Sequence, residues 1–286
     1  MRFAFFIPAY VLSTLYAYFL RIKFNRLPGG IDKVRFLNLL KAVRAQMFSP
    51  VRNRSEDLTK NLVAAYFISP GDLVIDVGAH FGRYALYYSS LVGNKGKVCA
   101  YEAHPQVYNK LKMNLKKLPQ ALPHNFAVSN QSDSTIKMKV YPDQLDRECG
   151  TVEELLMNSE RMPGNTAIIS VECQKLDDLQ EMSHSRKCSF IKIDVEGHEH
   201  AVIDGAIQFI RKHQPIVVYE YGCQPNVFEP RTIEQMNELG YVSYDCKTLK
   251  LARAQFPCPE PTDLVAIPKA RVNEFEMLAS LLRRNF

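Results

Sequence analysis

Residues 73–82, with the sequence LVIDVGAHFG, constrain the fold more than any other stretch of the 286-residue chain. Four of the first five residues are aliphatic and mostly β-branched, which predicts a buried parallel strand. Gly78 and Gly82 then bracket a tight turn, and the residues from Arg83 onward have the pattern of an amphipathic helix. A strand, a glycine turn and a helix in this order form the first βα unit of a nucleotide-binding sheet, whose ligands bind beyond the carboxyl ends of the strands.

The spacing of the two glycines separates two classes of nucleotide ligand. A dinucleotide pyrophosphate is typically bound by a G-x-G-x-x-G turn, whereas three residues separate Gly78 from Gly82 and the middle glycine is absent. We expect Asp76 to direct a carboxylate toward the pocket, where it repels phosphate and attracts an ammonium or sulfonium group. This combination favours S-adenosylmethionine (SAM) as the cofactor. The alternative is a structural Asp76 that caps the turn.

Strand and helix continue to alternate after this unit. The pattern predicts a second strand at residues 97–102, a helix at residues 105–118 and a third strand at residues 121–129. Glu102 ends the second strand, where an acid is placed to accept hydrogen bonds from both ribose hydroxyls of an adenosine. The third strand ends in small apolar groups and a hydroxyl, which we expect to line an adenine slot: Ala127, Val128 and Ser129.

The rest of the chain completes a single sheet after one interruption. Residues 131–187 break the alternation and predict an insertion packed near the pocket, with strands at residues 136–140 and 168–173 and a helix at residues 152–157. Further strands are expected at residues 190–197, 216–220, 241–245 and 264–267, and helices at residues 197–213 and 232–239. The whole pattern predicts an α/β, Rossmann-like domain with a mostly parallel seven-stranded sheet, helices on both faces and an antiparallel C-terminal hairpin.

Charge divides the chain into two parts. Residues 1–54 contain ten Lys and Arg and one acid, whereas residues 55–286 contain 26 Lys and Arg and 29 acids. The domain at residues 55–286 is thus mildly acidic, which argues against a nucleic-acid-binding surface on it. The seven cysteines have no C-x-x-C spacing, so we expect neither a zinc site nor a disulfide framework, as is typical of a cytoplasmic protein.

The N-terminal part, residues 1–54, combines an apolar segment with a basic connector. Residues 3–20 are uncharged and would form a helix about 27 Å long, the lower limit for spanning a bilayer. The basic residues that follow predict that the domain stays cytoplasmic and that this part associates with an anionic membrane surface. A helix packed on the protein's own core or on a partner is the alternative. A cleaved signal peptide is disfavoured because no A-x-A-like site follows.

Five motifs together carry a resemblance to a known family. They are residues 76–82 (DVGAHFG), 101–105 (YEAHP), 126–129 (FAVS), 176–179 (LDDL) and 191–197 (IKIDVEG). In this order and spacing the chain resembles the FkbM-type SAM-dependent methyltransferases over roughly residues 55–222. The resemblance implies a class I methyltransferase fold with SAM at the strand ends. It also implies methylation of hydroxyl oxygens, often on sugars or polyketide-type intermediates.

Two histidines depart from the pattern of that family. The family usually has Asn at the position of His80, and E-P-N-P where residues 102–105 are E-A-H-P. We expect His80 and Ala103 to contact the cofactor together with the glycine turn. Histidines in this pocket would titrate near neutral pH, but we favour neutral replacements that take over the hydrogen bonds of Asn.

The fourth strand carries the candidate catalytic acids. We expect Asp194 and Glu196 on one side of its end, where cofactor and acceptor meet, with Asp194 also contacting the cofactor. A hydroxyl acceptor needs a base, for which Asp194 and Glu196 are the first candidates and His198 and Glu220 the second. In the alternative, Glu196 caps the next helix and only Asp194 contacts ligand. We expect no metal, because Asp194 and Glu196 alone supply too few oxygen ligands.

The sequence therefore predicts an O-methyltransferase that acts on a hydroxyl of a sugar, a glycan or a lipid-linked saccharide. One alternative is an NAD(P)-dependent oxidoreductase, which the missing middle glycine and the absence of a Tyr-x-x-x-Lys pair disfavour. Another is a non-catalytic, membrane-associated adaptor, which the acids at three strand ends disfavour. No pattern in the chain predicts its oligomeric state.

Overall fold

The computed structural model describes residues 35, 38–39, 42, 55–142, 151–152, 166–179, 186–222, 231–252 and 262–285. Most of the N-terminal part, including the apolar run at residues 3–20, lies outside the described residues, so its role stays a prediction. Across the described ranges, no helix combines the length and the apolar character that a bilayer crossing requires.

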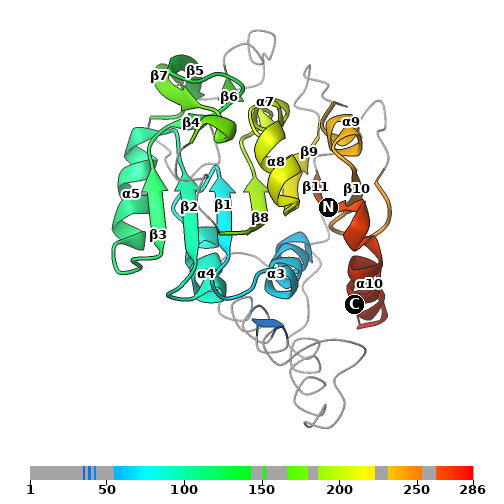
Figure 1. Cartoon of the computed structure of the whole chain (residues 1–286). Helices are drawn as coiled ribbons and strands as arrows, with labels where there is room; N and C mark the ends of the chain where they lie inside the picture. Colours follow the sequence, from blue (N-terminus) through cyan, green and yellow to red (C-terminus); the bar gives the residue numbers. More distant parts are fainter. Residues whose placement is uncertain are drawn as a thin grey trace, which may run out of the picture.

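A seven-stranded sheet forms the centre of the molecule (Figure 1). In spatial order its strands are β10 (Tyr241–Asp245), β11 (Thr262–Pro268), β9 (Ile216–Tyr221), β8 (Cys188–Ile193), β1 (Leu73–Val77), β2 (Lys97–Tyr101) and β3 (Ala121–His124). All neighbours are parallel except β11, which pairs antiparallel with β10 and β9. The predicted sheet, with its antiparallel C-terminal pair, is confirmed.

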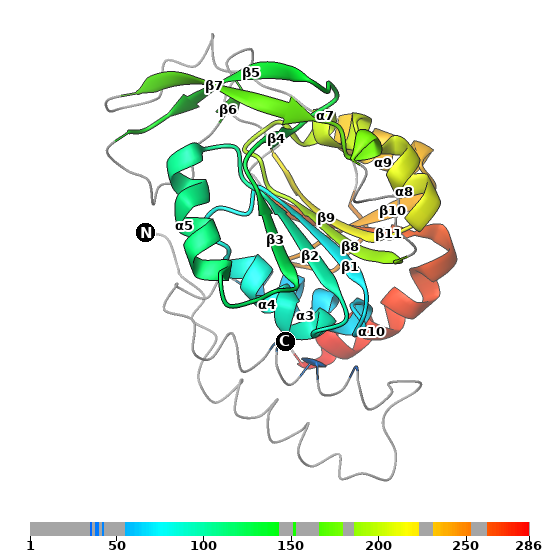
Figure 2. The same ribbon diagram turned by 60° about the vertical axis from the view of Figure 1, so that its left-hand side comes forward.

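Helices cover both faces of this sheet (Figure 2). One face packs against α3 (Ser55–Phe67), α4 (Arg83–Val92), α5 (Pro105–Leu115) and α10 (Val272–Asn285). The other face packs against α7 (Glu199–Asp204), α8 (Ile207–His213) and α9 (Arg231–Glu238). Both apolar clusters include residues of β1, β8 and β9, since successive strand residues point to opposite faces. Burial on both faces explains why these strands are continuous apolar runs.

The interruption of the alternation builds a second sheet, of order β4-β7-β5-β6. Its strands are β4 (Ala127–Val128), β5 (Ser134–Val140), β6 (Thr151–Val152) and β7 (Ala167–Gln174). In both views it lies beyond the carboxyl ends of β1, β2 and β3, and its apolar side packs against Ala103 (Figures 1 and 2). An insertion near the strand ends is confirmed. Val152, however, lies in a strand and not in the predicted helix, whose other residues are outside the described ones.

The expected third strand, at residues 121–129, is divided between the two sheets. It leaves the main sheet after His124, because this edge strand pairs only with β2 and β2 ends at Tyr101. Asn125 Nδ2 then donates hydrogen bonds to the carbonyl oxygens of Glu102 (2.9 Å) and Ala103 (3.1 Å). These bonds direct the chain away from the edge and toward β4. The prediction of one continuous strand was therefore wrong.

The helix expected at residues 197–213 is also divided, into α7 and α8. The break falls at Gly205, where a Cβ would lie 1.9 Å from the carbonyl oxygen of Ser129. A glycine is required for this close approach. The break thus brings the start of α8 against the residue that follows β4.

Candidate active site

The turn after β1 is fixed by backbone contacts with the neighbouring strands. The N–H groups of Gly78 and Ala79 donate to the carbonyl oxygen of Tyr101 at 3.0 and 2.9 Å. Gly78 has a φ of 72°, and a Cβ on it would lie 1.8 Å from the carbonyl oxygen of Asp194. Glycine is therefore needed twice here, for its backbone conformation and for the close approach of the loops that follow β1 and β8.

Glu102 holds this turn from the end of β2. Its Oε2 accepts the N–H of His80 at 2.9 Å and its Oε1 accepts the N–H of His104 at 2.8 Å. Burial raises the pKa of Glu102, and these two N–H groups oppose the rise. Each oxygen keeps a further lone pair for a ligand hydroxyl. The predicted position of Glu102 beside the glycine turn is confirmed, and its contact with a ribose stays a prediction.

The two histidines fill positions suited to Asn. His80 has a φ of 51°, in the left-handed region where Asn is among the favoured residues after glycine. His104 is the N-cap of α5, and its Nδ1 accepts the N–H of Gln106 at 3.2 Å. Burial lowers the pKa of His104. The interpretation of His104 as a neutral hydrogen-bonding replacement agrees with this geometry.

Asp76 lies beneath the turn and not in the pocket wall, where the sequence placed it. Its side chain is 0% exposed, and neither carboxylate oxygen has a hydrogen-bond partner among the described residues. It forms an ion pair with Lys192, whose Nζ lies 3.6 Å from Oδ1, because the two residues are opposite each other in β1 and β8. Burial raises the pKa of Asp76, and Lys192 opposes the rise. Asp76 therefore affects the site indirectly, through its ion pair with Lys192 and through the turn that follows β1.

The side chain of Lys192 contacts both the turn after β1 and the residue after β8. The sequence pattern did not identify it as a site residue. Its Nζ lies 3.1 Å from Asp194 Oδ2 and donates to the carbonyl oxygen of Gly78 at 3.4 Å. Burial opposes ionisation of Asp194, but Lys192 and Lys60 outweigh this effect and lower its pKa. Asp194 is thus a fixed negative charge. The available signal was the lysine itself, a charged residue inside the buried run at residues 191–193.

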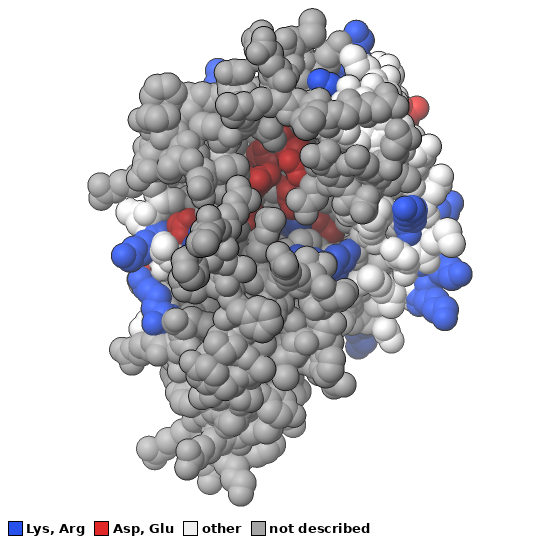
Figure 3. All heavy atoms as spheres, turned by 180° about the vertical axis from the view of Figure 1, so that it is seen from behind, with Lys and Arg blue, Asp and Glu red and all other residues white. Residues whose placement is uncertain are grey.

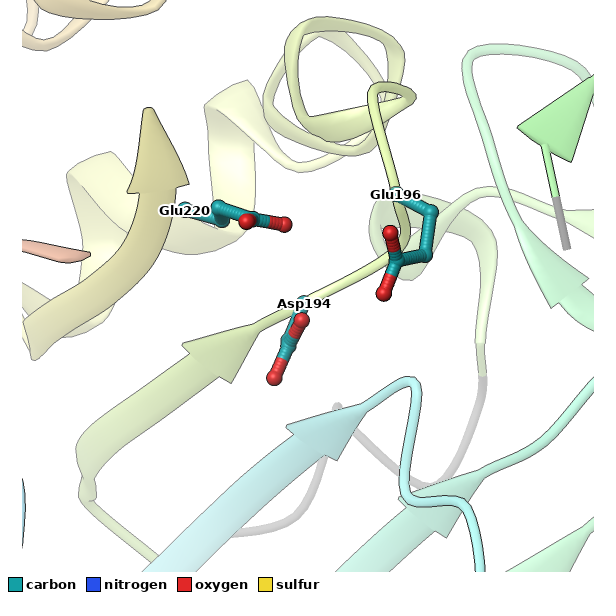
Figure 4. A group of neighbouring side chains, drawn as sticks. All are labelled: Asp194, Glu196 and Glu220. Carbon is teal, nitrogen blue, oxygen red and sulfur yellow. The ribbon is translucent and has the colours of Figure 1, made fainter. Parts of the chain in front are cut away.

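Three carboxylates converge at the ends of β8 and β9. Asp194, Glu196 and Glu220 each have a carboxylate oxygen within 4.8 Å of the others, and all three are half-buried. Figure 4 shows Glu220 on β9, Asp194 just after β8 and Glu196 in the next loop, directed toward a common space. On the reverse face of the molecule, acidic side chains lie close together (Figure 3). The structure thus brings together both first candidates for the base and one of the second.

This convergence removes the reason for excluding a metal ion. The exclusion counted two carboxylates, whereas the structure adds Glu220 as a third at a spacing that could hold a divalent cation. The absence of a metal ion therefore stays a prediction, but the count of two carboxylates no longer supports it. Below, the ends of β1 and β2 are called the cofactor side of the site, and the ends of β8 and β9 the acid side.

Glu199, which was also missed, binds the backbone of the loop after β8. Its Oε1 accepts the N–H of Val195 at 2.9 Å and its Oε2 accepts the N–H of Gly197 at 3.0 Å. Burial raises the pKa of Glu199 to about 8, against the effect of the Val195 N–H. The alternative interpretation of the sequence gave a capping role near this helix start to Glu196. The carboxylate that holds these N–H groups is Glu199, while Glu196 is directed toward Asp194 (Figure 4).

His198 and Ser129 pair with each other at the edge of the site. Ser129 Oγ lies 2.9 Å from His198 Nε2. Burial and the nearby His200 lower the pKa of His198 to about 4, so it is neutral at pH 7 and a weak base. Ser129 and Val128 are almost fully buried, at 1% and 2% exposure, and only Ala127 of the expected adenine slot is half-buried. Ala127 and Val128 form β4 and do not end the third strand, and the contact of these residues with an adenine stays a prediction.

The chemistry of the cofactor side fits SAM. The neighbouring acid side contributes three half-buried carboxylates, while Lys192 is 3% exposed and already paired with two acids. Such a set suits a ligand that carries an ammonium and a sulfonium group, and it is unsuited to a pyrophosphate. Within the described residues, the candidates to hold SAM are the glycine turn, His80, Glu102, Ala103 and Asp194.

Fold and site together define a class I methyltransferase architecture. Residues 76–243, more than half of the chain, match the family described as the methyltransferase FkbM domain. The chain therefore belongs to the FkbM methyltransferase domain family, whose cofactor is SAM. This assignment confirms the resemblance carried by the five motifs, and it leaves the oxidoreductase alternative without support.

Similar proteins of known name share this architecture at low identity. The hexuronic acid methyltransferase AglP of Haloferax volcanii is 24% identical over 148 residues, which are 51% of this chain and 55% of that protein. The chain thus matches about half the length of this curated relative. Two solved structures are similar, with TM-scores too low to add to the family assignment. The methyltransferase FkbM from Methylobacillus flagellatus has 14% identity and a TM-score of 0.42, with 84% of this chain and 63% of that chain covered. The fibrillarin of Aeropyrum pernix, solved with natively bound SAM, has 11% identity and a TM-score of 0.40, with coverages of 80% and 76%.

Proposed function

We propose that this protein transfers the methyl group of SAM to a hydroxyl oxygen of a sugar, either free or in a glycan or lipid-linked saccharide. The observation that carries the proposal is the convergence of Asp194, Glu196 and Glu220, with carboxylate oxygens within 4.8 Å of one another. The hexuronic acid methyltransferase at 24% identity supports a sugar acceptor.

A base is the chemical need that the acid side would meet. A hydroxyl is a weak nucleophile while protonated, and a positioned carboxylate that takes its proton contributes about 10²–10⁴ to the rate. Bound SAM supplies a methyl carbon activated by its sulfonium. The acceptor oxygen forms the new C–O bond, the C–S electron pair stays on sulfur, and the hydroxyl proton goes to a carboxylate.

The three carboxylates have different roles in this proposal. Lys192 lies 3.1 Å from Asp194 and lowers its pKa, which makes Asp194 a poor proton acceptor. Asp194 is then the fixed charge that orients the cofactor and the acceptor hydroxyl. Glu196 and Glu220 are then the candidates to take the proton, and Glu196 is the first choice.

The same charge distribution favours an uncharged acceptor group. A sugar carboxylate needs no base before methylation, and three nearby carboxylates would repel it. We therefore expect a methyl ether on a hydroxyl and not a methyl ester on a uronic acid.

Methyl transfer to matched acceptors tests this function. The full chain, with SAM labelled in its methyl group, is assayed with pairs of neutral and uronate-bearing saccharides, and the products are identified by mass spectrometry. Ethers on the neutral members support the proposal, whereas esters on the uronates contradict it. Binding of SAM in calorimetry without transfer to any acceptor would favour the adaptor alternative. A chelator in a parallel assay tests the expectation that no metal is needed.

The proposal extends to the place where the protein acts. An uncharged run at residues 3–20 and a net charge of +9 over residues 1–54 support association with the cytoplasmic face of an anionic membrane. Fractionation of the full chain against a form that starts at Ser55 tests this. Full chain that stays in the soluble fraction at low salt contradicts membrane association.

A further inference from the structure

The loop between β8 and α7 holds a glutamate in an unfavourable backbone conformation. Glu196 has a φ of 56°, in the left-handed region that L-residues other than Asn and Asp rarely adopt. Such conformations are strained and persist only where the surrounding structure enforces them. The residue in this conformation is also the one whose carboxylate faces Asp194 and Glu220 (Figure 4).

The carboxyl of Glu199 binds the backbone on both sides of Glu196. It accepts the N–H groups of Val195 and Gly197, at 2.9 and 3.0 Å, which are the residues immediately before and after Glu196. Glu199 is 5% exposed and lies in the first turn of α7. A side chain of α7 therefore holds the backbone of the loop on both sides of Glu196.

We infer that Glu199 is a positioning residue that fixes Glu196 in the left-handed conformation and thereby directs its carboxylate into the acid side. A displacement of a catalytic group by about 1 Å from its productive geometry can lower the rate about 100-fold. A buried acid that prevents such a displacement therefore supports turnover. The inference rests on the proposed function in one respect, the role of Glu196 as proton acceptor.

Glu199→Gln is the matched variant that tests this role. A carboxyl group, protonated or not, offers lone pairs on both oxygens, whereas an amide offers them on one only. The variant therefore loses one of the two loop bonds at nearly constant volume. We expect kcat to fall about 100-fold, with the Kd for SAM changed by less than about threefold. Glu238→Gln, at the exposed end of α9, is the control and should match the wild type.

A double-mutant cycle separates positioning from general damage to the fold. If Glu199 acts through Glu196, the Glu199→Gln change costs little further once Glu196→Gln is present. Losses that multiply fully in the double variant overturn the inference. So does an unchanged kcat in Glu199→Gln when Glu196→Gln alone is impaired.

Hydrogen exchange tests the two hydrogen bonds between Glu199 and the loop, and it requires no methyl transfer. The amides of Val195 and Gly197 should exchange at least tenfold faster in Glu199→Gln, while the amide of Ile191 within β8 should not change. Unchanged exchange at both loop amides overturns the inference. If Glu196→Gln keeps normal turnover but these amides exchange faster, the proposed base is wrong and the grip on the loop is upheld.

Discussion

The two sides of the site hold their functional groups by different means. On the cofactor side, backbone N–H groups are bound by backbone carbonyls and by Glu102, which accepts two of them. On the acid side, three half-buried carboxylates face one another. One side is built from satisfied hydrogen bonds, and the other gathers like charges that repel. The cofactor side is therefore held by backbone groups and one supporting carboxyl, whereas the acid side must keep mutually repelling side chains together.

Each side has one supporting residue, Glu102 on the cofactor side and Glu199 on the acid side. The carboxyl of each accepts two backbone N–H groups. Lys192 joins the two sides, because it lies 3.6 Å from Asp76, 3.1 Å from Asp194 and 3.4 Å from the carbonyl oxygen of Gly78. The comparison predicts that variants on one side change binding, that variants on the other change turnover, and that loss of Lys192 affects both.

The largest effect is expected on the acid side. Glu196→Gln keeps the shape of the side chain but cannot accept a proton, so kcat should fall by about 10²–10⁴. The Kd for SAM, measured by calorimetry, should stay within a few-fold of the wild type. Near-normal turnover of this variant, together with a large loss in Glu220→Gln, would transfer the role of the base to Glu220.

Loss of the link between the two sides should reduce stability. Lys192→Met leaves Asp76 and Asp194 without their buried cation, and an uncompensated buried charge costs about 3–5 kcal/mol. Urea unfolding measures this loss, with the exposed Lys117→Met as the control. A free energy of unfolding equal to that of the control would mean that Lys192 does not couple the two sides.

A smaller effect, on binding, is expected on the cofactor side. Glu102→Gln loses the charge of a group that holds the N–H groups of His80 and His104, and such a bond is worth about 1.5–3 kcal/mol. The Kd for SAM should rise by about tenfold or more, with little change of kcat at saturating SAM. A loss confined to kcat would remove the distinction between the two sides.

A further expected effect is a dependence of stability on pH through Glu199. Burial raises its pKa in the folded state to about 8, from an ordinary value of 4.5. Between these values the folded state binds a proton that the unfolded state has released. The stability from this group is thus fully present below the unfolded pKa and is lost as the pH rises through the folded one. Unfolding free energies of the wild type, relative to Glu199→Gln, should therefore fall from about pH 5 to about pH 9. A constant difference would contradict the raised pKa.

The cofactor side could be predicted from the sequence because its parts are local. Strand, glycine turn and helix follow one another directly, and Glu102 ends the next strand of an unbroken alternation. Asp76 was placed in the correct strand, but its carboxylate does not lie in the pocket wall; it is buried and pairs with Lys192 of a strand more than 100 residues later. Alternation along one strand says nothing about the charge opposite it.

The acid side could be predicted only in part. The acids of residues 191–197 were recognised, but the strand ends at Ile193, so strand alternation does not place Asp194 and Glu196. Their convergence depends on the left-handed Glu196 and on the grip of Glu199, neither of which a residue pattern specifies. The second sheet was hidden for a related reason: the turn at Asn125 moves residues 127–128 to new partners that lie more than 40 residues later.

The contact at Gly78 has a consequence for anyone who recombines or redesigns proteins of this kind. The peptide of Asp194 occupies the space that a Cβ on Gly78 would fill, so the two loops constrain each other although 115 residues separate them. A chimera with a crossover between these positions inherits the two loops from different parents. Its junction succeeds only if both parents leave this space to the backbone, and new acceptor specificity is therefore best transplanted with both loops together.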